Sequence, residues 1–307
     1  MARFEYMEPH TLRQGISMLQ RHGNQARIVA GSTDFLVRWR TGAWRPQYVV
    51  NIQHIRGLDR LSYSSRTGLR LGTLVTLQTL ETHPVIREKY PALATGATSF
   101  AGVQVRNLAT VGGNVCNASP AGDTLPALLA FETQCRVVGP EGERWIPLDQ
   151  LFQGPGRTAL QPAEILTELR LPPPARNSGS LYIKHSPRGA MDIAAIGVAS
   201  VVTLGQRGQV CEDVKIALGA VAPTPIRAYS AEDLLRGQAI TPELVRLVAQ
   251  EAQRLATSID DVRATAAYRQ SMVAVLVQRT LERSIEMART PSIPFEVQRR
   301  LAIQAAF

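Results

Sequence analysis

Two glycine-bearing segments have residue types that could bind phosphate. AGSTDFL, residues 30–36, directly precedes a helical pattern, and TVGGN, residues 110–114, interrupts an apolar stretch. Glycine allows close approach of the main chain, and N–H groups at a helix start lack an intrahelical acceptor. These N–H groups and the hydroxyls of Ser32, Thr33 and Thr110 could donate to phosphate oxygens. A diphosphate would suit the pair, although each segment alone is typical of an ordinary tight turn.

The spacing excludes the common nucleotide-binding and hydrolytic motifs. The dinucleotide fingerprint G-x-G-x-x-G is missing, because the first segment has a single glycine, and no P-loop lysine follows either segment. The five histidines are scattered, and neither G-x-S-x-G nor H-E-x-x-H occurs. We therefore predict no catalytic side chain and no metal ligand. If the chain belongs to an enzyme, a cofactor must carry the chemistry.

Two charged residues are further candidates for binding. Asp123 directly precedes the helical pattern that starts at Thr124, where it could cap the helix or accept a hydrogen bond from a ribose hydroxyl. Lys184 is one of only three lysines, against 31 arginines, and lies in a predicted strand. Its compact ammonium could approach a polar ring edge or a phosphate. The alternative is a surface lysine on a strand.

Composition limits the class of protein. The chain has 307 residues, a net charge of +9 and 45% hydrophobic residues, enough for a substantial core. Its arginines are dispersed and no basic run of five or more occurs, so a solvated surface or a surface for an anionic partner is favoured over nucleic acid. The uncharged apolar run at residues 193–206 is too short to span a membrane. Three cysteines without C-x-x-C spacing predict a reduced, cytoplasmic protein.

Hydrophobic periodicity divides the chain into four parts. We predict an α/β unit over 1–57, a second α+β unit over 58–175, a C-terminal domain over 176–290 and a tail over 291–307. Strands are expected at 26–31, 48–52, 69–72, 165–172, 180–185, 193–204 and 213–221, with a hairpin over 134–148. Helices are expected from Thr11 to Gly23, at 34–40, after Thr76, and at 90–100, 124–131, 242–256 and 265–287. Residues 154–160 are expected to form a loop, and the linker is PPPARNSGS, 172–180.

Four longer motifs occur in order along nearly the whole chain. They are AGSTDFL, QVRNLATVGGNVCNASPAGDTLPALLAF, LFQGPGRTALQPAEILTELRLP and YRQSMVAVLVQRTLE. Together they resemble the FAD-binding medium subunit of the molybdenum hydroxylase family, which includes the xanthine dehydrogenase, carbon monoxide dehydrogenase and 4-hydroxybenzoyl-CoA reductase groups. The Cys-rich insertion of the last group is absent, so its additional iron–sulfur cluster is not predicted.

The resemblance implies an α+β fold. A vanillyl-alcohol-oxidase-type (PCMH-type) FAD-binding domain of two α+β subdomains would hold FAD between them. A C-terminal domain with a three-stranded antiparallel sheet and a helix bundle would follow. The implied FAD-binding residues are Ile28, Val29, Ala30, Gly31, Ser32, Thr33, Asp34, Phe35, Phe100, Ala109, Thr110, Val111, Gly112, Gly113, Asn114, Asp123, Leu166 and Lys184.

The implied roles differ along this set. Residues 28–35 would wrap the pyrophosphate, and residues 109–114 would form a second cradle. Phe100 and Leu166 would pack on the cofactor and the flavin region, Asp123 would bind a polar group of FAD, and Lys184 would lie near the isoalloxazine edge.

The first segment departs from the family pattern at one position. Ser32 stands where the family usually has glycine. A serine there must adopt a backbone conformation that a side chain disfavours, which could shift the geometry of the first segment.

The resemblance also implies an electron-transfer role within a complex. A large molybdopterin subunit would oxidise the substrate, and a small subunit with [2Fe–2S] clusters would pass electrons to FAD on this chain. FAD would reduce an external acceptor, either NAD, a quinone, oxygen or a carrier protein. The expected assembly is a dimer of heterotrimers. Two alternatives remain: a stand-alone FAD-dependent oxidase of the same fold, and a nucleic-acid-binding protein, suggested by charge alone.

Overall fold

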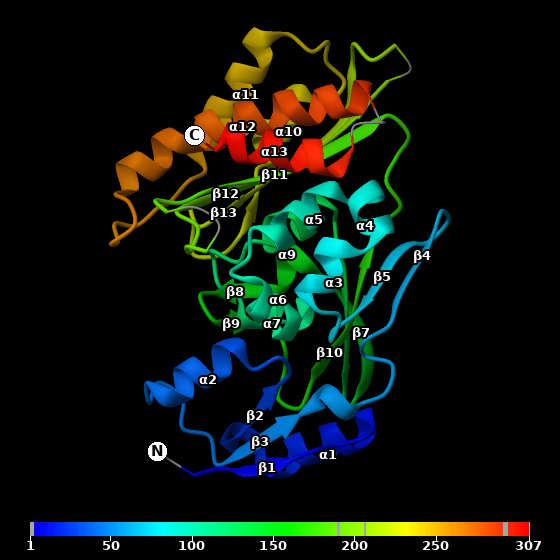
Figure 1. Cartoon of the computed structure of the whole chain (residues 1–307), viewed down its shortest axis with the longest axis vertical. Helices are drawn as coiled ribbons and strands as arrows, with labels where there is room; N and C mark the ends of the chain where they lie inside the picture. Colours follow the sequence, from blue (N-terminus) through cyan, green and yellow to red (C-terminus); the bar gives the residue numbers. More distant parts are fainter. Residues whose placement is uncertain (1–2, 189–190, 206, 291–293, 307) are drawn as a thin grey trace.

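The computed structural model describes residues 3–188, 191–205, 207–290 and 294–306. Three sheet-containing units are stacked along the long axis of the molecule (Figure 1). The N-terminal unit lies at one end, a second unit lies in the middle, and the C-terminal sheet with its long helices lies at the other end. This arrangement confirms the predicted α+β class.

The N-terminal unit is a small parallel sheet with helices. Its elements are β1 (Glu5–Met7), α1 (Leu12–His22), β2 (Ala26–Val29), α2 (Thr33–Arg40) and β3 (Tyr48–Asn51). The strand order is β1-β3-β2, and both pairs are parallel. As predicted, Thr11 caps α1, in a capping box with Gln14, and α1 ends at Gly23, whose φ is +50°. The carboxyl end of β2 therefore leads directly into the start of α2.

The second unit is an antiparallel sheet covered by short helices. Its sheet has the order β4-β5-β10-β6-β7, and β8 pairs with β9. The strands are β4 (Leu61–Ser64), β5 (Gly68–Gly72), β6 (Gln134–Gly139), β7 (Gly142–Pro147), β8 (Phe152–Gly154), β9 (Arg157–Thr158) and β10 (Ile165–Leu171). The helices are α3 (Leu77–Thr82), α4 (Pro84–Lys89), α5 (Pro91–Thr98), α6 (Val103–Leu108), α7 (Val111–Asn117), α8 (Leu125–Ala130) and α9 (Leu148–Leu151). The predicted hairpin is the pair β6 and β7, and Thr76 caps α3 as expected.

The C-terminal unit packs helices on an antiparallel sheet. Its strands are β11 (Ser178–His185), β12 (Ile196–Leu204), β13 (Cys211–Gly219) and β14 (Ile226–Arg227), paired in that order. Its helices are α10 (Tyr229–Leu235), α11 (Pro242–Arg254), α12 (Ala266–Arg289) and α13 (Phe295–Ala305). The two-residue β14 adds a fourth strand to the three that the resemblance implies. One apolar core lies between this sheet and the helices.

Two local predictions were wrong. Residues 111–114 do not form a loop but the first turn of α7, because the Thr110 hydroxyl accepts a hydrogen bond from Gly113 N at 3.1 Å and caps the helix. Asp123 is not a helix cap, since α8 begins two residues later with Thr124 at the cap position. Burial explains the second error: the Asp123 carboxylate contacts side chains of β11 instead.

The predicted tail is partly helical, since α13 lies within 291–307. Residues 291–293 and 307 of this tail lie outside the described residues. The boundaries between the four predicted parts remain predictions. Within the described ranges, no helix is long and apolar enough to cross a bilayer.

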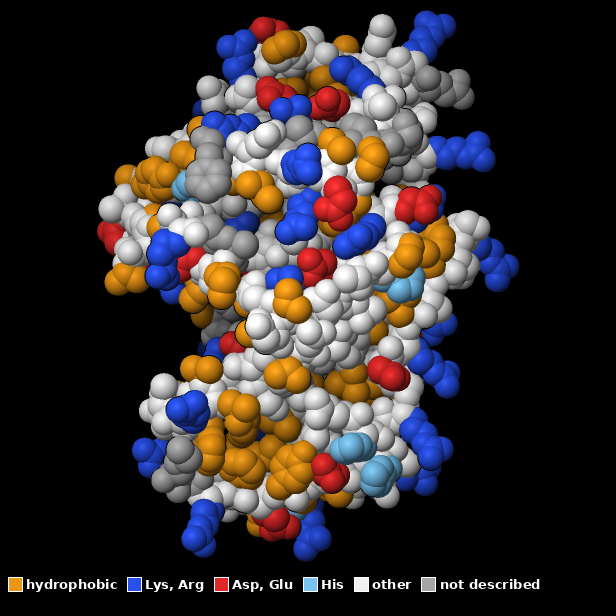
Figure 2. Space-filling model, viewed as in Figure 1, with side chains coloured by type: hydrophobic (Ala, Val, Ile, Leu, Met, Phe, Trp, Pro, Cys, Tyr) orange, Lys and Arg blue, Asp and Glu red, His pale blue; other side chains and the backbone are white. Residues whose placement is uncertain are grey.

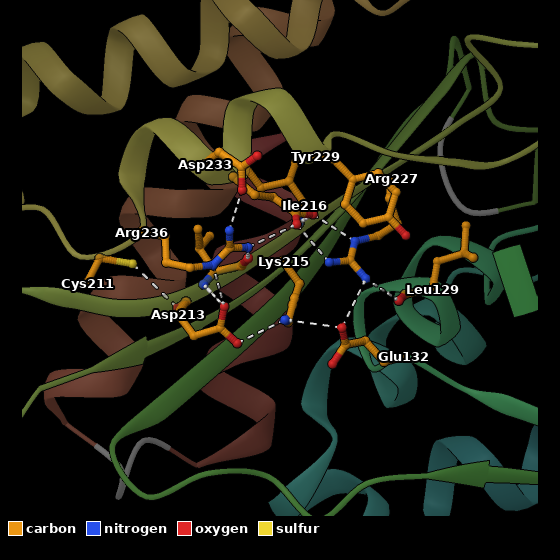
Figure 3. Close-up of polar contacts among 12 residues, drawn as sticks. Leu129, Glu132, Cys211, Asp213, Lys215, Ile216, Arg227, Tyr229, Asp233 and Arg236 are labelled. Atoms are coloured by element: carbon orange, nitrogen blue, oxygen red, sulfur yellow. Dashed lines mark hydrogen bonds and ion pairs between the residues drawn. The ribbon is translucent and has the colours of Figure 1, made fainter. Parts of the chain in front are cut away.

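An ion-pair network joins the middle and C-terminal units (Figure 3). Arg227 forms a two-pronged pair with the fully buried carboxylate of Glu232, at 2.7 and 2.8 Å. A third nitrogen of Arg227 donates to Leu129 O, at the end of α8, at 3.2 Å. Lys215 on β13 reaches Glu132 at 3.1 Å and Asp213 at 3.0 Å. These contacts fix the C-terminal sheet on α8.

Candidate cofactor-binding site

A cleft with a cavity volume of about 200 Å³ separates the N-terminal unit from the second unit. Its walls come from the β2–α2 segment, from α7, and from the residues around Phe100 and Leu166. Apolar side chains gather over the N-terminal unit in the view of Figure 2, whereas Lys and Arg side chains lie along the edges and over the opposite half of the molecule. Cofactor sites are typically concave and mainly apolar with a few polar groups, and this cleft is of that kind.

The first glycine segment forms the turn between β2 and α2. A Cβ at Gly31 would overlap the carbonyl group of Leu108, so only glycine fits against α6 here. Ser32 adopts a left-handed conformation, with φ of +60°, as expected where a glycine is usual. Its side chain makes no capping hydrogen bond within the described chain. The first N–H groups of α2 also lack an intrahelical acceptor, so this turn can donate to an anion.

Asp34 lies in the first turn of α2, where the negative charge of its carboxylate would oppose the binding of an anionic ligand. Burial raises the pKa of its carboxyl, while the positive charge of Arg38 and a hydrogen bond with Asn117 lower it. The carboxylate is thus held by α2 and α7 side chains and its charge is partly compensated.

The second glycine segment presents a different surface from the first. The N–H groups of Val111, Gly112 and Gly113 donate to Val75 O at 2.9 Å, Thr73 O at 3.0 Å and the Thr110 hydroxyl at 3.1 Å. These N–H groups are therefore engaged within the protein.

The two glycines of this segment contribute space instead. Neither has a positive φ. A Cβ at Gly112 would overlap the Thr73 hydroxyl, so Gly112 allows close packing of α7. Gly113 is exposed and lines the cleft, where it leaves a flat main-chain surface.

A buried arginine, which the sequence analysis did not single out, shapes the Phe100 side of the cleft. Arg106 on α6 forms an ion pair with Glu81 at 2.7 Å, with both side chains about nine-tenths buried. It also donates to Phe100 O at 3.1 Å and Ala101 O at 2.8 Å. Ala101 has a left-handed φ of +42°, which these bonds hold in place. Arg106 thereby fixes the main chain that carries Phe100.

A β-bulge directs Leu166 into the cleft. The register between β10 and β6 shifts between Leu166 and Glu168. An extra residue of this kind bends a strand and changes the direction of its side chains. Leu166 is buried and lines the cleft, where it can pack against a ring system.

One hydrogen bond joins the two sides of the cleft. Arg38 on α2 donates to the side-chain oxygen of Asn117 on α7 at 2.8 Å, and its guanidinium stacks 4.6 Å from the Trp44 ring. Trp44 and Asn117 also line the cleft. A hydrogen bond between residues 79 positions apart in the sequence has no local sequence signal, which is why the sequence analysis missed it.

Asp123 and Lys184 lie together behind the cleft. The Lys184 ammonium is 2.9 Å from one carboxylate oxygen of Asp123, and the Tyr182 hydroxyl donates to the other at 2.9 Å. Lys184 also donates to Ser99 O at 2.9 Å, next to Phe100 in the chain. Burial raises the pKa of Asp123 to about 6, against the opposing effects of Lys184 and Tyr182. The pair couples the β11 strand to the Phe100 wall.

Comparison with known proteins identifies the family to which this chain belongs. Residues 2–174 match the family model of the FAD binding domain in molybdopterin dehydrogenase. Residues 182–284 match the model of the CO dehydrogenase flavoprotein C-terminal domain. This chain belongs to the FAD-binding subunits of the molybdopterin dehydrogenases. The family predicted from the sequence motifs is therefore confirmed.

Relatives match this FAD-binding subunit over most of its length. The xanthine dehydrogenase FAD-binding subunit of Escherichia coli O157:H7 is 29% identical and covers 92% of the chain and 96% of the relative. The carbon monoxide dehydrogenase medium chain of Hydrogenophaga pseudoflava is 30% identical, and the match covers 91% of this chain and 96% of that medium chain. The solved carbon monoxide dehydrogenase from Hydrogenophaga pseudoflava, which lacks the Mo-pyranopterin moiety, gives a TM-score of 0.88 at 31% identity, covering 92% and 97%.

The FAD-binding subunit brings most of the predicted site residues into one cleft. The predicted residues that line it are Ile28, Val29, Ala30, Gly31, Ser32, Thr33, Asp34, Phe35, Phe100, Ala109, Thr110, Gly112, Gly113, Asn114 and Leu166. Val111 is buried in the core, and Asp123 and Lys184 form the ion pair behind the wall. Their contacts with FAD, like those of the lining residues, remain predictions. The lining residues that the sequence analysis missed are Trp44, Ile52, Thr73, Cys116, Asn117, Leu160 and Ile165.

Proposed function

We propose that this chain transfers electrons through FAD, which would receive them from [2Fe–2S] clusters on a small partner subunit and pass them to an external acceptor. The proposal rests on the cleft, in which the uncapped start of α2 faces apolar walls. The chain that forms this cleft belongs to the FAD-binding family. When bound, FAD supplies redox chemistry that accepts electrons singly and donates them in pairs. The polypeptide would bind the cofactor, orient it and shield it from solvent.

The residues fit the parts of FAD in a defined way. The first turn of α2 would hold the diphosphate through main-chain N–H groups, since those of the α7 turn already donate within the protein. Gly113 and the hydroxyl of Thr110 would provide a close, flat wall. Phe100, fixed by Arg106, and Leu166 would pack on apolar ring surface. Lys184 would lie beyond Phe100, near the isoalloxazine edge.

The partners follow from the relatives. Their names describe medium chains and FAD-binding subunits of xanthine and carbon monoxide dehydrogenases, and one solved relative is named for its missing Mo-pyranopterin. We infer a small iron–sulfur subunit and a large molybdopterin subunit, in a dimer of heterotrimers. Substrate oxidation would then take place on another chain. The three free cysteines support a reducing, cytoplasmic environment.

The test compares flavin content in the complex purified with its partner subunits. Gly113→Val puts a branched side chain into the cleft from an exposed position, so we expect flavin content to fall at least about tenfold, equivalent to about 1.4 kcal/mol of binding. Gln304→Val, on the exposed face of α13, is the control and should retain flavin. Normal flavin in the Gly113 variant would refute the cleft as the FAD site. Absence of flavin from the unmodified complex would refute the proposed function.

A further inference from the structure

The C-terminal helix α13 lies beyond both family matches, the second of which ends at residue 284. Its role therefore does not follow from family membership. Figure 1 shows α13, in red, between the C-terminal helices and α5. It packs against β11 and α12 of the C-terminal unit and against α5 of the second unit. The helix thus bridges two parts of the molecule.

The C-terminal end of α13 is held by side chains from other elements. Arg279 on α12 donates to Ala305 O at 2.7 Å, and the His185 ring nitrogen Nδ1 lies 2.9 Å from Ala306 O. The last carbonyl groups of a helix lack intrahelical donors, so these contacts satisfy them where the helix ends. His185 directly follows Lys184 on β11, which places this anchor beside the Asp123 ion pair.

The other end of α13 is held more loosely. The Arg87 guanidinium on α4 lies 4.9 Å from the ring centre of Phe295 and 3.6 Å from the Glu296 carboxylate. These groups are exposed or partly exposed, so each contact contributes little to stability. The helix is anchored mainly at its C-terminal end.

A cavity of about 110 Å³ lies beneath α13. Its floor includes Ser99, Tyr182 and Lys184, and its cover includes Ala302 and Ile303 of α13. Ala302 is buried, and the side chain of Lys184, which lines the cavity, is only 4% exposed. The small side chain of Ala302 lets the helix lie close over the cavity, which Arg299 and Ile303 of the same helix also line.

We propose that α13 is a C-terminal cover that closes this cavity and shields the Lys184–Asp123 ion pair from solutes. Displacement of α13 would give solutes access to Lys184 from the side of α5 and β11. The inference concerns the polypeptide and does not require bound FAD. If the proposed function also holds, the same cover would limit the access of acceptors to the isoalloxazine edge near Lys184.

The scarcity of lysine makes the cover testable. Lys89, Lys184 and Lys215 are the three lysines of the chain, and their side chains are 43%, 4% and 18% exposed. We would treat the FAD-free full chain with acetyl N-hydroxysulfosuccinimide and follow each lysine by peptide mass spectrometry. In the unmodified chain, Lys184 should react at least about tenfold more slowly than Lys89, because it reacts only on local opening.

Two variants remove the cover and one serves as a control. Ala302→Arg puts a long cation on the buried face of α13, and deletion of residues 294–307 removes the helix; both should raise the Lys184 rate at least about tenfold. Gln304→Arg adds an equivalent side chain on the exposed face and should change nothing. Continued protection of Lys184 in the deletion variant would overturn the proposal. A parallel rise at Lys215 would also overturn it, since α13 would then be part of the folding core.

Discussion

Of the two adjacent glycines in α7, only Gly112 should lose substantial stability when alanine replaces it. A Cβ at Gly112 would overlap the Thr73 hydroxyl and would lie 2.8 Å from both Cβ and O of Thr73. Even with the hydroxyl rotated away, these contacts are about 0.6 Å shorter than an ordinary 3.4 Å contact. Gly112→Ala must therefore move α7 away from Thr73 and weaken the 3.0 Å hydrogen bond from Gly112 N. At Gly113, the only nearby atom is the Thr110 hydroxyl.

The free energies follow from these contacts. Overpacking costs about 1–3 kcal/mol, and a weakened buried N–H adds about 1–3 kcal/mol. Alanine recovers about 1 kcal/mol of helix propensity, which leaves Gly112→Ala destabilised by about 3 kcal/mol. In Gly113→Ala the same gain offsets a disturbed Thr110 cap, worth about 1 kcal/mol, so the net change should be near zero.

Urea unfolding of the FAD-free chain, followed by fluorescence, measures both variants. The double variant Gly112→Ala with Thr73→Ala tests the cause, because it removes the overlapping hydroxyl but keeps the contacts with Cβ and O. It should recover about half of the loss, a coupling of at least about 1 kcal/mol. Equal stability of the Gly112 and Gly113 single variants, or no coupling with Thr73, would refute the reasoning.

Three further predictions concern other parts of the molecule. Arg227→Met leaves the buried Glu232 carboxylate without its two-pronged partner and should destabilise the chain by about 3–5 kcal/mol. Adding Glu232→Gln should restore part of the lost stability, and full stability of the single variant would contradict this account. Burial raises the pKa of Asp123 from 3.8 to about 6, so the folded chain binds this proton more tightly than the unfolded chain, and the resulting stability is lost as pH rises between about 4 and 6. Asp123→Asn should flatten that part of a stability–pH curve, and an unchanged slope would contradict the assignment to Asp123. Ser32→Gly removes a left-handed side-chain conformation and should raise the unfolding free energy by about 1 kcal/mol in urea, whereas a loss would show that Ser32 is not strained.

Short-range patterns in the sequence predicted much of the fold. The α1 helix could be placed because Thr11 and Gly23 mark its ends, and the hairpin of β6 and β7 because residues alternate on both sides of a turn. The α7 helix could not be placed in this way. Two adjacent glycines argue against a helix, and only the packing of Gly112 on Thr73, some 40 residues earlier, makes them favourable.

The site shows the same division between local and distant causes. The β2–α2 segment was predicted because all of its signals lie within a few residues. Arg106 was not singled out, although it stands within a quoted motif, because its role depends on carbonyl groups of the Phe100 turn and on Glu81. For Asp123 the local pattern favoured a helix cap, whereas its carboxylate pairs with Lys184, 61 residues away. Long-range contacts decide these roles, and no residue pattern encodes them.

In the proposed FAD site, the two halves of the cleft would contribute to binding in different ways. The β2–α2 turn has uncapped N–H groups that could donate to an anionic group of the ligand. The N–H groups of the α7 turn donate to acceptors within the protein, so this turn instead allows the ligand to lie close to the main chain. A substitution that blocks the α7 wall should weaken FAD binding through steric exclusion, with little dependence on ionic strength. One that disturbs the α2 turn should weaken it through lost hydrogen bonds to the diphosphate, whose electrostatic part depends on salt. The salt dependence of FAD affinity consequently separates the two walls, which a single measurement of flavin content cannot do.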